Sequence, residues 1–406
     1  MEVTLTQNDH ISDAVLLALD ELKIELPSWG FADTGTRFGK FAQPAAARTT
    51  DEKFHDAGLV HKLTGCCPSV AVHVLWDFDV SEDPDRAADA TASMAEKHGV
   101  RVGSINPNLF QDQVYKLGSF CSPDPAARMA AMQHTLHCVE LLKGTGSSAL
   151  SLWLADGTNY PGQDNLRARK QRLAEALKQV HDAMPDDSTM LVEYKPFEPA
   201  FYHTDIADWG MAASFARSAG PKAKVLVDTG HHLPGANIEH IVAFLLDENL
   251  LGGFHFNDRK YADDDLTLGS VDPYAVFRIF NELTQFATDT DAPAKIDYMV
   301  DQSHNLKPKL EAMVQTVCDA QALFAKAQLV DREALAQCQA DGDIVGAERC
   351  LKDAFETDVR PLLAKWRKSK GLSADPLKTL RESGHIERLG EERAARHPAS
   401  TVSAYA

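Results

Sequence analysis

The sequence predicts an α/β protein, a (β/α)8 TIM barrel with an additional C-terminal α-helical extension. Between residues 27 and 305, short apolar runs rich in β-branched side chains alternate with longer helical segments. Continuous apolar runs are typical of parallel strands that are buried on both faces. Eight such runs, with a helix after nearly every one, fit a closed barrel better than an open doubly wound sheet. After residue 305 the strand-like runs stop, and long helical patterns follow.

The expected elements divide the chain into two parts, a catalytic barrel with an N-terminal helix (1–305) and a helical extension involved in oligomerisation (306–406). The first apolar run, PSWGFADTG, is short and interrupted, and the VLLALDELKIEL segment before it has the pattern of an amphipathic helix. The eight strands are expected at 27–35, 69–79, 100–108, 148–157, 189–199, 224–232, 251–260 and 295–305. Helices are expected between them at 83–99, 124–146, 165–184, 206–220 and 237–250.

The composition restricts the class of function. A net charge of −18 and a sequence pI near 5.3 predict a soluble, cytoplasmic protein without a surface for nucleic acid or membranes. No run approaches the roughly 18 apolar residues of a membrane span, and the N-terminus lacks the pattern of a secretory signal. The seven cysteines form no CxxC pair, which favours reduced thiols over a zinc site or a disulfide framework.

Four ionisable residues stand late in four consecutive expected strands. They are Glu193, Asp228, His255 and Asp301, and each follows two or three apolar residues. Because the carboxyl ends of barrel strands meet at the active face, these side chains should point into one small volume. Three carboxylates cannot share such a volume unless a cation neutralises them. Oxygen ligands with one imidazole suit Mn²⁺, Co²⁺, Mg²⁺ or Zn²⁺, so this pattern predicts a metal site rather than four separate helix N-caps.

A second set of ligands is expected near the first, on the stretch GGFHFNDRKYADDD and on the sixth strand. His231 can turn towards the same cavity, and Asp263 and Asp265, two residues apart, can face the same way in an extended turn. These three residues predict a second metal site. Asp264 is expected to point outward, and Asp258 to support His255 or the loop. A solvated acidic loop remains the alternative for these aspartates.

Three residues offer surfaces for a sugar. His73 lies late in the second expected strand, with Trp76 close behind it, and Trp153 lies on the fourth expected strand. The flat indole faces suit a sugar ring, but aromatic side chains in these positions are equally suited to the core.

Longer motifs resemble the L-rhamnose isomerases, which have a xylose-isomerase-like TIM barrel. The similarity is closest to the broad-specificity bacterial subtype that also converts D-allose and D-psicose, and it extends from about residue 25 into the helical tail. The motifs that carry it are SWGFADTGTRFGKFAQPAAA, VHVLWDFD, VEYKPFEPAFYHT, VDTGHH, GGFHFNDRKYADDDL and MVDQSHN.

The resemblance implies roles for these residues. The first set of ligands would hold a structural metal and the second set a catalytic metal, with Mn²⁺ as the preferred activator. Lys195 would contact the sugar near O1 and O2, and His73 would lie near the ring oxygen. Phe38 would reach into the active site of a neighbouring subunit of a homotetramer. One departure from the family, Pro196 directly after Lys195, puts the local backbone in doubt.

The activity implied is the interconversion of an aldose and a ketose, L-rhamnose with L-rhamnulose and also D-allose with D-psicose. Hydrogen would move between C1 and C2 as a metal-assisted hydride shift, or as a proton with Asp301 or water as the base. One alternative is a ketose 3-epimerase, a family in which a pair of glutamates acts on a similar barrel. A metal-dependent endonuclease would need a basic groove that this acidic chain lacks, and a non-catalytic assembly protein would leave the clustered carboxylates unexplained.

Overall fold

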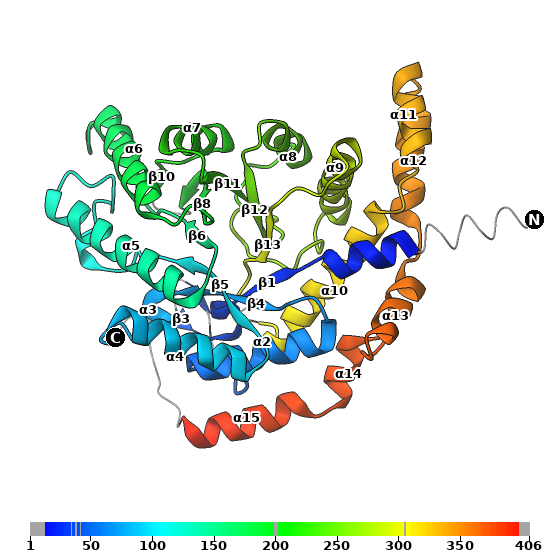
Figure 1. The fold of residues 1–406 in the computed structure, drawn as a ribbon, viewed down its shortest axis with the longest axis horizontal. Helices are drawn as coiled ribbons and strands as arrows, with labels where there is room; N and C mark the ends of the chain where they lie inside the picture. The colour runs from blue at the N-terminus through cyan, green and yellow to red at the C-terminus, as the bar shows by residue number, and fades with distance from the viewer. Residues whose placement is uncertain are drawn as a thin grey trace, which may run out of the picture.

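In the part of the chain that the structure describes, eight parallel strands close into a barrel (Figure 1). The structure is a computed structural model that describes residues 13–33, 35–36, 39–40, 42–198, 202–303 and 306–397. Around the barrel the strands follow the order β1, β13, β12, β11, β8, β6, β5, β4. Their bounds are β1 Ile24–Pro27, β4 Ser69–His73, β5 Arg101–Asn106, β6 Ala149–Leu152, β8 Thr189–Glu193, β11 Ala223–Asp228, β12 Leu251–Phe256 and β13 Asp297–Val300. The predicted fold class is therefore confirmed.

Helices cover the outside of the barrel. They are α2 Thr50–Thr64, α4 Pro84–Lys97, α5 Pro125–Thr145, α6 Leu166–Ala183, α7 Trp209–Ala219, α8 Ile238–Asp247, α9 Pro273–Thr290 and α10 Lys309–Ala327, with the single turn α3 Val74–Asp77 after β4. Seven of them begin behind a polar residue whose side chain accepts a hydrogen bond from a backbone N–H of the first turn. These caps are Thr49, Asp83, Asp124, Asn165, Asp208, Asn237 and Asp272. None of the strand-end ligand candidates is among these caps, so the helix N-termini do not account for their positions.

Short elements decorate the barrel, and some predicted residues lie outside the described chain. The strands β7 Gly157–Thr158, β9 Phe197–Glu198 and β10 Tyr202–Thr204 form a small antiparallel sheet, and β2 Gly35–Thr36 pairs with β3 Gly39–Lys40. Phe38, expected to contact a neighbouring subunit, falls between these last two strands and outside the described residues. No helix of the described chain is both long and apolar enough to span a membrane.

The first strand differs from its prediction. It occupies Ile24–Pro27, not 27–35, and the helix before it ends at residue 21. Ile24 and Leu26 are fully buried, while Glu25 between them is only partly buried. Buried and less buried side chains thus alternate from Ile24 to Leu26, which is before the apolar run that begins at residue 27. A 3-10 helix, η1 Ser28–Phe31, follows directly and occupies most of the segment that was expected to be strand.

The helical extension also begins later than predicted. Helix α10 follows the last barrel strand and packs against both α9 and α2, so it completes the ring of helices instead of lying outside the barrel repeat. The helices beyond it are α11 Arg332–Asp341, α12 Ile344–Glu356, α13 Arg360–Ser369, α14 Pro376–Glu382 and α15 His385–Arg396. In Figure 1, α11 and α12 project at one side and α13 to α15 run back beneath α2.

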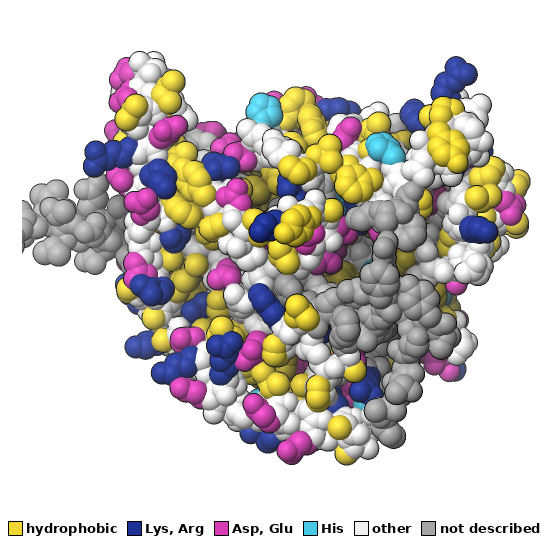
Figure 2. Space-filling model, turned by 180° about the vertical axis from the view of Figure 1, so that it is seen from behind, with side chains coloured by type: hydrophobic (Ala, Val, Ile, Leu, Met, Phe, Trp, Pro, Cys, Tyr) yellow, Lys and Arg dark blue, Asp and Glu magenta, His cyan; other side chains and the backbone are white. Residues whose placement is uncertain are grey.

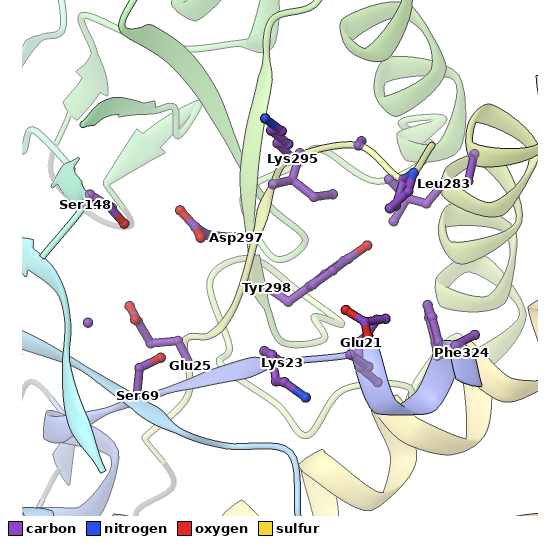
Figure 3. Close-up of a pocket in the computed structure, with 18 of the residues that line it drawn as sticks. Glu21, Lys23, Glu25, Ser69, Ser148, Leu283, Lys295, Asp297, Tyr298 and Phe324 are labelled. Atoms are coloured by element: carbon purple, nitrogen blue, oxygen red, sulfur yellow. The ribbon is translucent and has the colours of Figure 1, made fainter. Parts of the chain in front are cut away.

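A thin apolar layer divides the barrel interior into two ends. Below this layer the first residues of the strands border a cavity of about 440 Å³ (Figure 3). At this end the Glu25 carboxylate packs directly against Gly103, since a Cβ atom at position 103 would come within 1.6 Å of it. The backbone N–H of Ser104 donates to the same carboxylate at 2.9 Å. The layer consists of Ala149, Leu191, Leu226 and Met299. Side chains along a barrel strand point alternately inward and outward. The inward residue two positions after each residue of this layer therefore lies at the C-terminal end of the barrel.

Candidate metal centre

The four strand-end residues of the first predicted set meet at the C-terminal end of the barrel. Each offers one ligand atom, and these atoms all lie within 4.8 Å of one another. The four residues are Glu193, Asp228, His255 and Asp301. Glu193 and Asp228 are the last residues of β8 and β11, His255 is the last but one of β12, and Asp301 follows β13. Parallel register brings them together, because Asp228 pairs directly with His255 across β11 and β12.

Charge is crowded in this cluster. Burial raises the pKa of Asp228 to about 7, with Glu193 and Asp301 nearby as further causes, and burial also raises the pKa of Asp301. Burial acts on Glu193 in the same direction, but the neighbouring His255 and His231 imidazoles hold its pKa at about 2. Three carboxylates in one buried volume repel one another and are stabilised when a cation lies between them. Burial opposes a charge on His231 and His255, but the surrounding carboxylates raise the pKa of both imidazoles, so protons on these rings supply part of that charge and a bound cation would take their place.

The His255 imidazole has no protein partner that satisfies it. Its Nδ1 lies 3.3 Å from Glu193, 3.8 Å from Asp301 and 3.9 Å from Asp228. Neither ring nitrogen meets the geometry of a hydrogen bond within the described chain, although both are buried. Buried polar atoms are rarely left in this state. An imidazole among three carboxylate oxygens is a donor set that suits a divalent transition metal, so the residues present fit such an ion.

Two residues that sequence reasoning did not name hold the carboxylates in place. Asn257 donates from Nδ2 to both oxygens of Asp228, at 3.0 and 3.1 Å. The indole Nε1 of Trp29 donates to Asp301 at 2.8 Å. Such partners orient metal ligands and fix their charge. The position of Asn257 carried a usable signal, since it is the next inward residue after His255, whereas Trp29 lay in a segment whose structure was predicted wrongly.

The second predicted set lies beside the first. His231 Nε2 lies 3.1 Å from Asp263, and Lys195 Nζ lies 2.6 Å from the other oxygen of that carboxylate. Asp265 borders the same cavity and has a left-handed backbone, with φ of 46°. Burial and the neighbouring Asp263 raise the pKa of Asp265 well above its usual range. Because the Lys195 ammonium already neutralises part of Asp263, a second cation would have to share that carboxylate with Lys195.

The other two acids of the loop serve its own fold. Asp264 accepts hydrogen bonds from the backbone N–H groups of residues 260, 261 and 262, at 2.6, 2.7 and 3.2 Å. Asp258 accepts from the N–H groups of Val271 and Asp272, at 2.8 and 3.1 Å. The role of Asp258 in supporting the loop was expected from the sequence, whereas Asp264, expected only to point outward, also supports the loop, and Asp263 and Asp265 border the cavity.

Lys195 keeps its position despite the proline that follows it. Its backbone N–H donates to the carbonyl of Ile206 at 3.0 Å, and its ammonium also lies 2.8 Å from Glu198. Burial opposes the charge, but Asp263 and Glu198 raise the pKa of Lys195 above its ordinary value. The departure at Pro196 therefore does not displace the side chain from the cavity.

Aromatic rings form the wall of the cavity that faces the carboxylates. The ring of His73 lies 4.2 Å from that of Trp76 and 4.8 Å from that of Trp29, and Phe110 lies 5.1 Å from Trp153. The cavity holds about 270 Å³. Phe110 was not singled out from the sequence, because it lies in a loop beyond β5 with no strand-end pattern. The three predicted residues His73, Trp76 and Trp153 all line the cavity.

Polar atoms on this wall also lack protein partners. The Trp153 Nε1 and the hydroxyl of Ser151, both on the β6 side of the cavity, are buried and make no hydrogen bond within the described chain. Burial and the nearby Lys53 lower the pKa of His73 to about 3, which keeps its imidazole neutral at pH 7. The wall therefore offers flat apolar faces together with unused donors, a combination that suits a small hydroxylated ligand.

A closed (β/α)8 barrel with carboxylates and imidazoles clustered at its C-terminal end defines a class of barrel proteins whose active face could hold a divalent cation. Residues 69–285 match the family described as xylose isomerase-like TIM barrel, and the chain belongs to this family.

Relatives share nearly the whole chain. A probable sugar isomerase of Rhizobium meliloti (strain 1021) is 40% identical over 388 residues, which are 94% of this chain and 89% of that protein. A probable sugar isomerase of Mesorhizobium japonicum is 39% identical over the same length and coverage. The xylose isomerase of Thermus thermophilus is 27% identical over 203 residues, 45% of this chain and 49% of that protein.

Solved structures share the fold at low identity. The D-psicose 3-epimerase of Clostridium cellulolyticum H10 with D-tagatose has a TM-score of 0.51 and 11% identity, covering 76% of this chain and 98% of that one. A structure of L-ribulose 3-epimerase has a TM-score of 0.51 and 15% identity, covering 80% of this chain and 98% of that one. At this identity the likeness shows the barrel alone.

Proposed function

We propose that the protein is a metal-dependent aldose–ketose isomerase that interconverts L-rhamnose and L-rhamnulose, and also D-allose and D-psicose. The observation that carries the proposal is the cluster of three carboxylates and one imidazole facing an aromatic wall across a cavity of about 270 Å³. Relatives named as probable sugar isomerases, with up to 40% identity over most of the chain, support it. The motif resemblance described above supports L-rhamnose as the substrate.

The cavity suits a monosaccharide chemically. A sugar has apolar C–H faces, which pack on the rings of Trp76, Phe110 and Trp153, and hydroxyl groups, which need buried hydrogen-bond partners. The unused Ser151 hydroxyl and Trp153 Nε1 are available to such hydroxyls. Lys195 lies 5.2 Å from the ring centre of Trp153, so a charged donor stands at the boundary between the aromatic wall and the acidic cluster.

A divalent cation held by the Glu193–Asp228–His255–Asp301 set would supply Lewis-acid polarisation of sugar oxygens. The residues of the chain would do the rest. Lys195, kept protonated by its carboxylate neighbours, would donate a hydrogen bond to a carbonyl oxygen of the open-chain sugar. His73, kept neutral by burial, would pass a proton from the anomeric hydroxyl to the ring oxygen while the bond between the anomeric carbon and that oxygen breaks. In the proton-transfer route, the ionised Asp301 would accept the proton from one of the two carbons, C1 or C2, and return it to the other.

Further parts of the proposal rest on the resemblance. They are a second cation held by His231, Asp263 and Asp265, Mn²⁺ as the preferred ion, and a homotetramer. The raised pKa of Asp265 supports the second cation, because a buried carboxyl beside another carboxylate is stabilised by added positive charge.

Two other activities on this barrel differ in testable ways. A ketose 3-epimerase would share the fold, as the solved structures show, but would change the configuration at C3 and form no aldose. An endonuclease would need a continuous basic surface. On the face shown in Figure 2, Lys and Arg side chains are interspersed with Asp and Glu, and the net charge of −18 also disfavours a phosphodiester substrate.

The test is metal removal followed by product analysis. The protein is stripped with EDTA, and Mn²⁺, Co²⁺, Mg²⁺ or Zn²⁺ is added back before incubation with L-rhamnose, L-mannose, L-lyxose, D-allose or D-psicose. We expect no conversion without metal and the fastest aldose–ketose conversion for L-rhamnose with Mn²⁺. Asp301→Asn should lower kcat/KM by about 10²-fold or more, while Asp89→Asn, an exposed control on α4, should not. Conversion of ketoses to C3 epimers without aldose would contradict the isomerase assignment.

A further inference from the structure

Tyr194 stands between two residues of the site but points away from it. Strand alternation directs its neighbours Glu193 and Lys195 into the barrel and directs Tyr194 outward, where it is 1% exposed. His232 is placed in the same way beside His231 and is 7% exposed. Neither Tyr194 nor His232 lines the cavity that the acidic cluster borders. The two outward side chains therefore cannot touch a substrate there.

These two buried side chains are joined by a short hydrogen bond. The Tyr194 hydroxyl lies 2.7 Å from His232 Nε2, and their rings meet edge to face with centres 5.3 Å apart. The bond links the end of β8 to the segment after β11, the two places from which Glu193 and His231 enter the cavity. It crosses between two neighbouring barrel strands at the level of the site.

The backbone of Tyr194 also contacts the other histidine. His231 Nδ1 lies 3.1 Å from the Tyr194 carbonyl oxygen, the geometry of an N–H donor to that carbonyl. When Nδ1 carries the proton, Nε2 is left with a lone pair that faces Asp263 at 3.1 Å. A divalent cation between that lone pair and the carboxylate would satisfy both, whereas a doubly protonated His231 would donate to Asp263 from Nε2. Tyr194 therefore contacts both consecutive histidines, one through its carbonyl and one through its hydroxyl.

We propose that Tyr194 and His232 are a positioning pair, which fixes Glu193, Lys195 and His231 in the geometry that binds the cation. This proposal rests on the proposed function only for the identity of the cation, since it concerns how the protein side chains that bind the cation are held. The hydroxyl–imidazole bond sets the distance between the two strand ends. Without it, the ring of Tyr194 could keep its packing while His231 and Glu193 lost their mutual register.

The test measures Mn²⁺ affinity without any sugar, by competition with a chelator, alongside the thermal midpoint Tm. Tyr194→Phe keeps the ring and removes the hydroxyl, and we expect it to weaken Mn²⁺ binding about tenfold or more. His232→Gln keeps an acceptor for the hydroxyl, and we expect it to stay within about threefold of the unmodified protein. The double variant Tyr194→Phe/His232→Gln should be as weak as Tyr194→Phe alone.

A matched control exists on the same barrel. Tyr298 on β13 is packed outward against the rings of Phe254, Phe256 and Phe280, so Tyr298→Phe should leave Mn²⁺ affinity unchanged. Unchanged affinity in Tyr194→Phe together with a lowered Tm would overturn the proposal, because the pair would then serve stability alone. Absence of Mn²⁺ binding by the unmodified protein would also overturn it. Mn²⁺ binding that depends on Tyr194, in a protein without sugar activity, would uphold the pair and reject the isomerase.

Discussion

The indole of Trp29 and the carboxylate of Asp301 are joined by a hydrogen bond of 2.8 Å across 272 positions of sequence. Trp29 lies in η1, directly after the first barrel strand, and Asp301 follows the last. Because β1 pairs with β13 to close the barrel, the two ends of the barrel sequence meet at the site. The same indole also packs edge-on against His73, with ring centres 4.8 Å apart, so it joins the acidic cluster to the aromatic wall.

Replacing Trp29 by Phe should weaken metal binding. The change removes the donor from Asp301 and leaves a carboxylate whose pKa burial already raises. We expect Mn²⁺ affinity, measured by chelator competition, to fall about tenfold, as is common for partners of metal ligands. Trp366→Phe is a suitable control, because that indole donates to Asp20, outside the acidic cluster. Equal affinities of Trp29→Phe and the unmodified protein would show that Asp301 needs no donor.

Metal binding should stabilise the fold. A cation relieves the repulsion among three buried carboxylates, and a hundredfold excess over Kd contributes about 2.7 kcal/mol to the free energy of unfolding. We expect Mn²⁺ to raise the Tm of EDTA-treated protein by several degrees. Glu193→Gln should abolish this increase and Asp89→Asn should keep it. An unchanged Tm on adding Mn²⁺ to the stripped protein would argue against a cation at this cluster.

Asp297, at the N-terminal end of the barrel, should make stability depend on pH. Although Asp297 is exposed at the start of β13, loss of water contacts at the cavity, together with Glu25, raises its pKa to about 6 in the folded protein, against 3.8 ordinarily. The folded state therefore favours the protonated form, and this contribution is full below about pH 4 and is lost as pH rises through 6. Asp297→Asn should be more stable than the unmodified protein at pH 7, by no more than about 1 kcal/mol since the carboxyl borders an open cavity.

The measurement for Asp297 is chemical denaturation at pH 4 and at pH 7. The difference in unfolding free energy between variant and unmodified protein should be larger at pH 7 than at pH 4. The same difference at both values would contradict the role of this carboxyl. Glu21→Gln, an exposed carboxyl bordering the same cavity, provides the control.

The ion pair between Arg393 and Asp56 should hold the last helix. Arg393 on α15 donates to both oxygens of Asp56 on α2, at 2.7 and 2.9 Å, and both side chains are buried. Arg393→Gln should lower the free energy of unfolding by about 3 kcal/mol, because it removes the guanidinium from a buried carboxylate and leaves His55 Nδ1 beside it, at 3.1 Å. Arg396→Gln, whose side chain is 61% exposed, should change it by less than about 1 kcal/mol.

Urea denaturation measures both arginine variants. Adding Asp56→Asn to Arg393→Gln should recover part of the loss, since the unpaired charge is then removed. A loss for Arg393→Gln no greater than that for Arg396→Gln would show that α15 is held by its apolar contacts.

The pattern of ionisable residues at the strand ends predicted which side chains form the acidic cluster. Alternation along each strand and parallel closure of the barrel place Glu193, Asp228, His255 and Asp301 at one level, so their convergence could be read from spacing alone. His231, Asp263 and Asp265 follow the same strand ends and border the same cavity, and their role as a second metal site stays a prediction. The fold class followed from the same repetition of apolar runs and helices.

Other features depended on contacts that spacing does not encode. Whether Ile24–Pro27 or the run after it forms the first strand depended on which residues face the core, and the place of α10 depended on its packing against both α9 and α2. Trp29, Phe110 and the Tyr194–His232 pair were found only in three dimensions. The sequence thus determined the barrel and the residues at its strand ends, since both follow from a local period. The tertiary structure decided the partners that orient those residues, because such partners are selected by closure of the barrel between segments far apart in the chain.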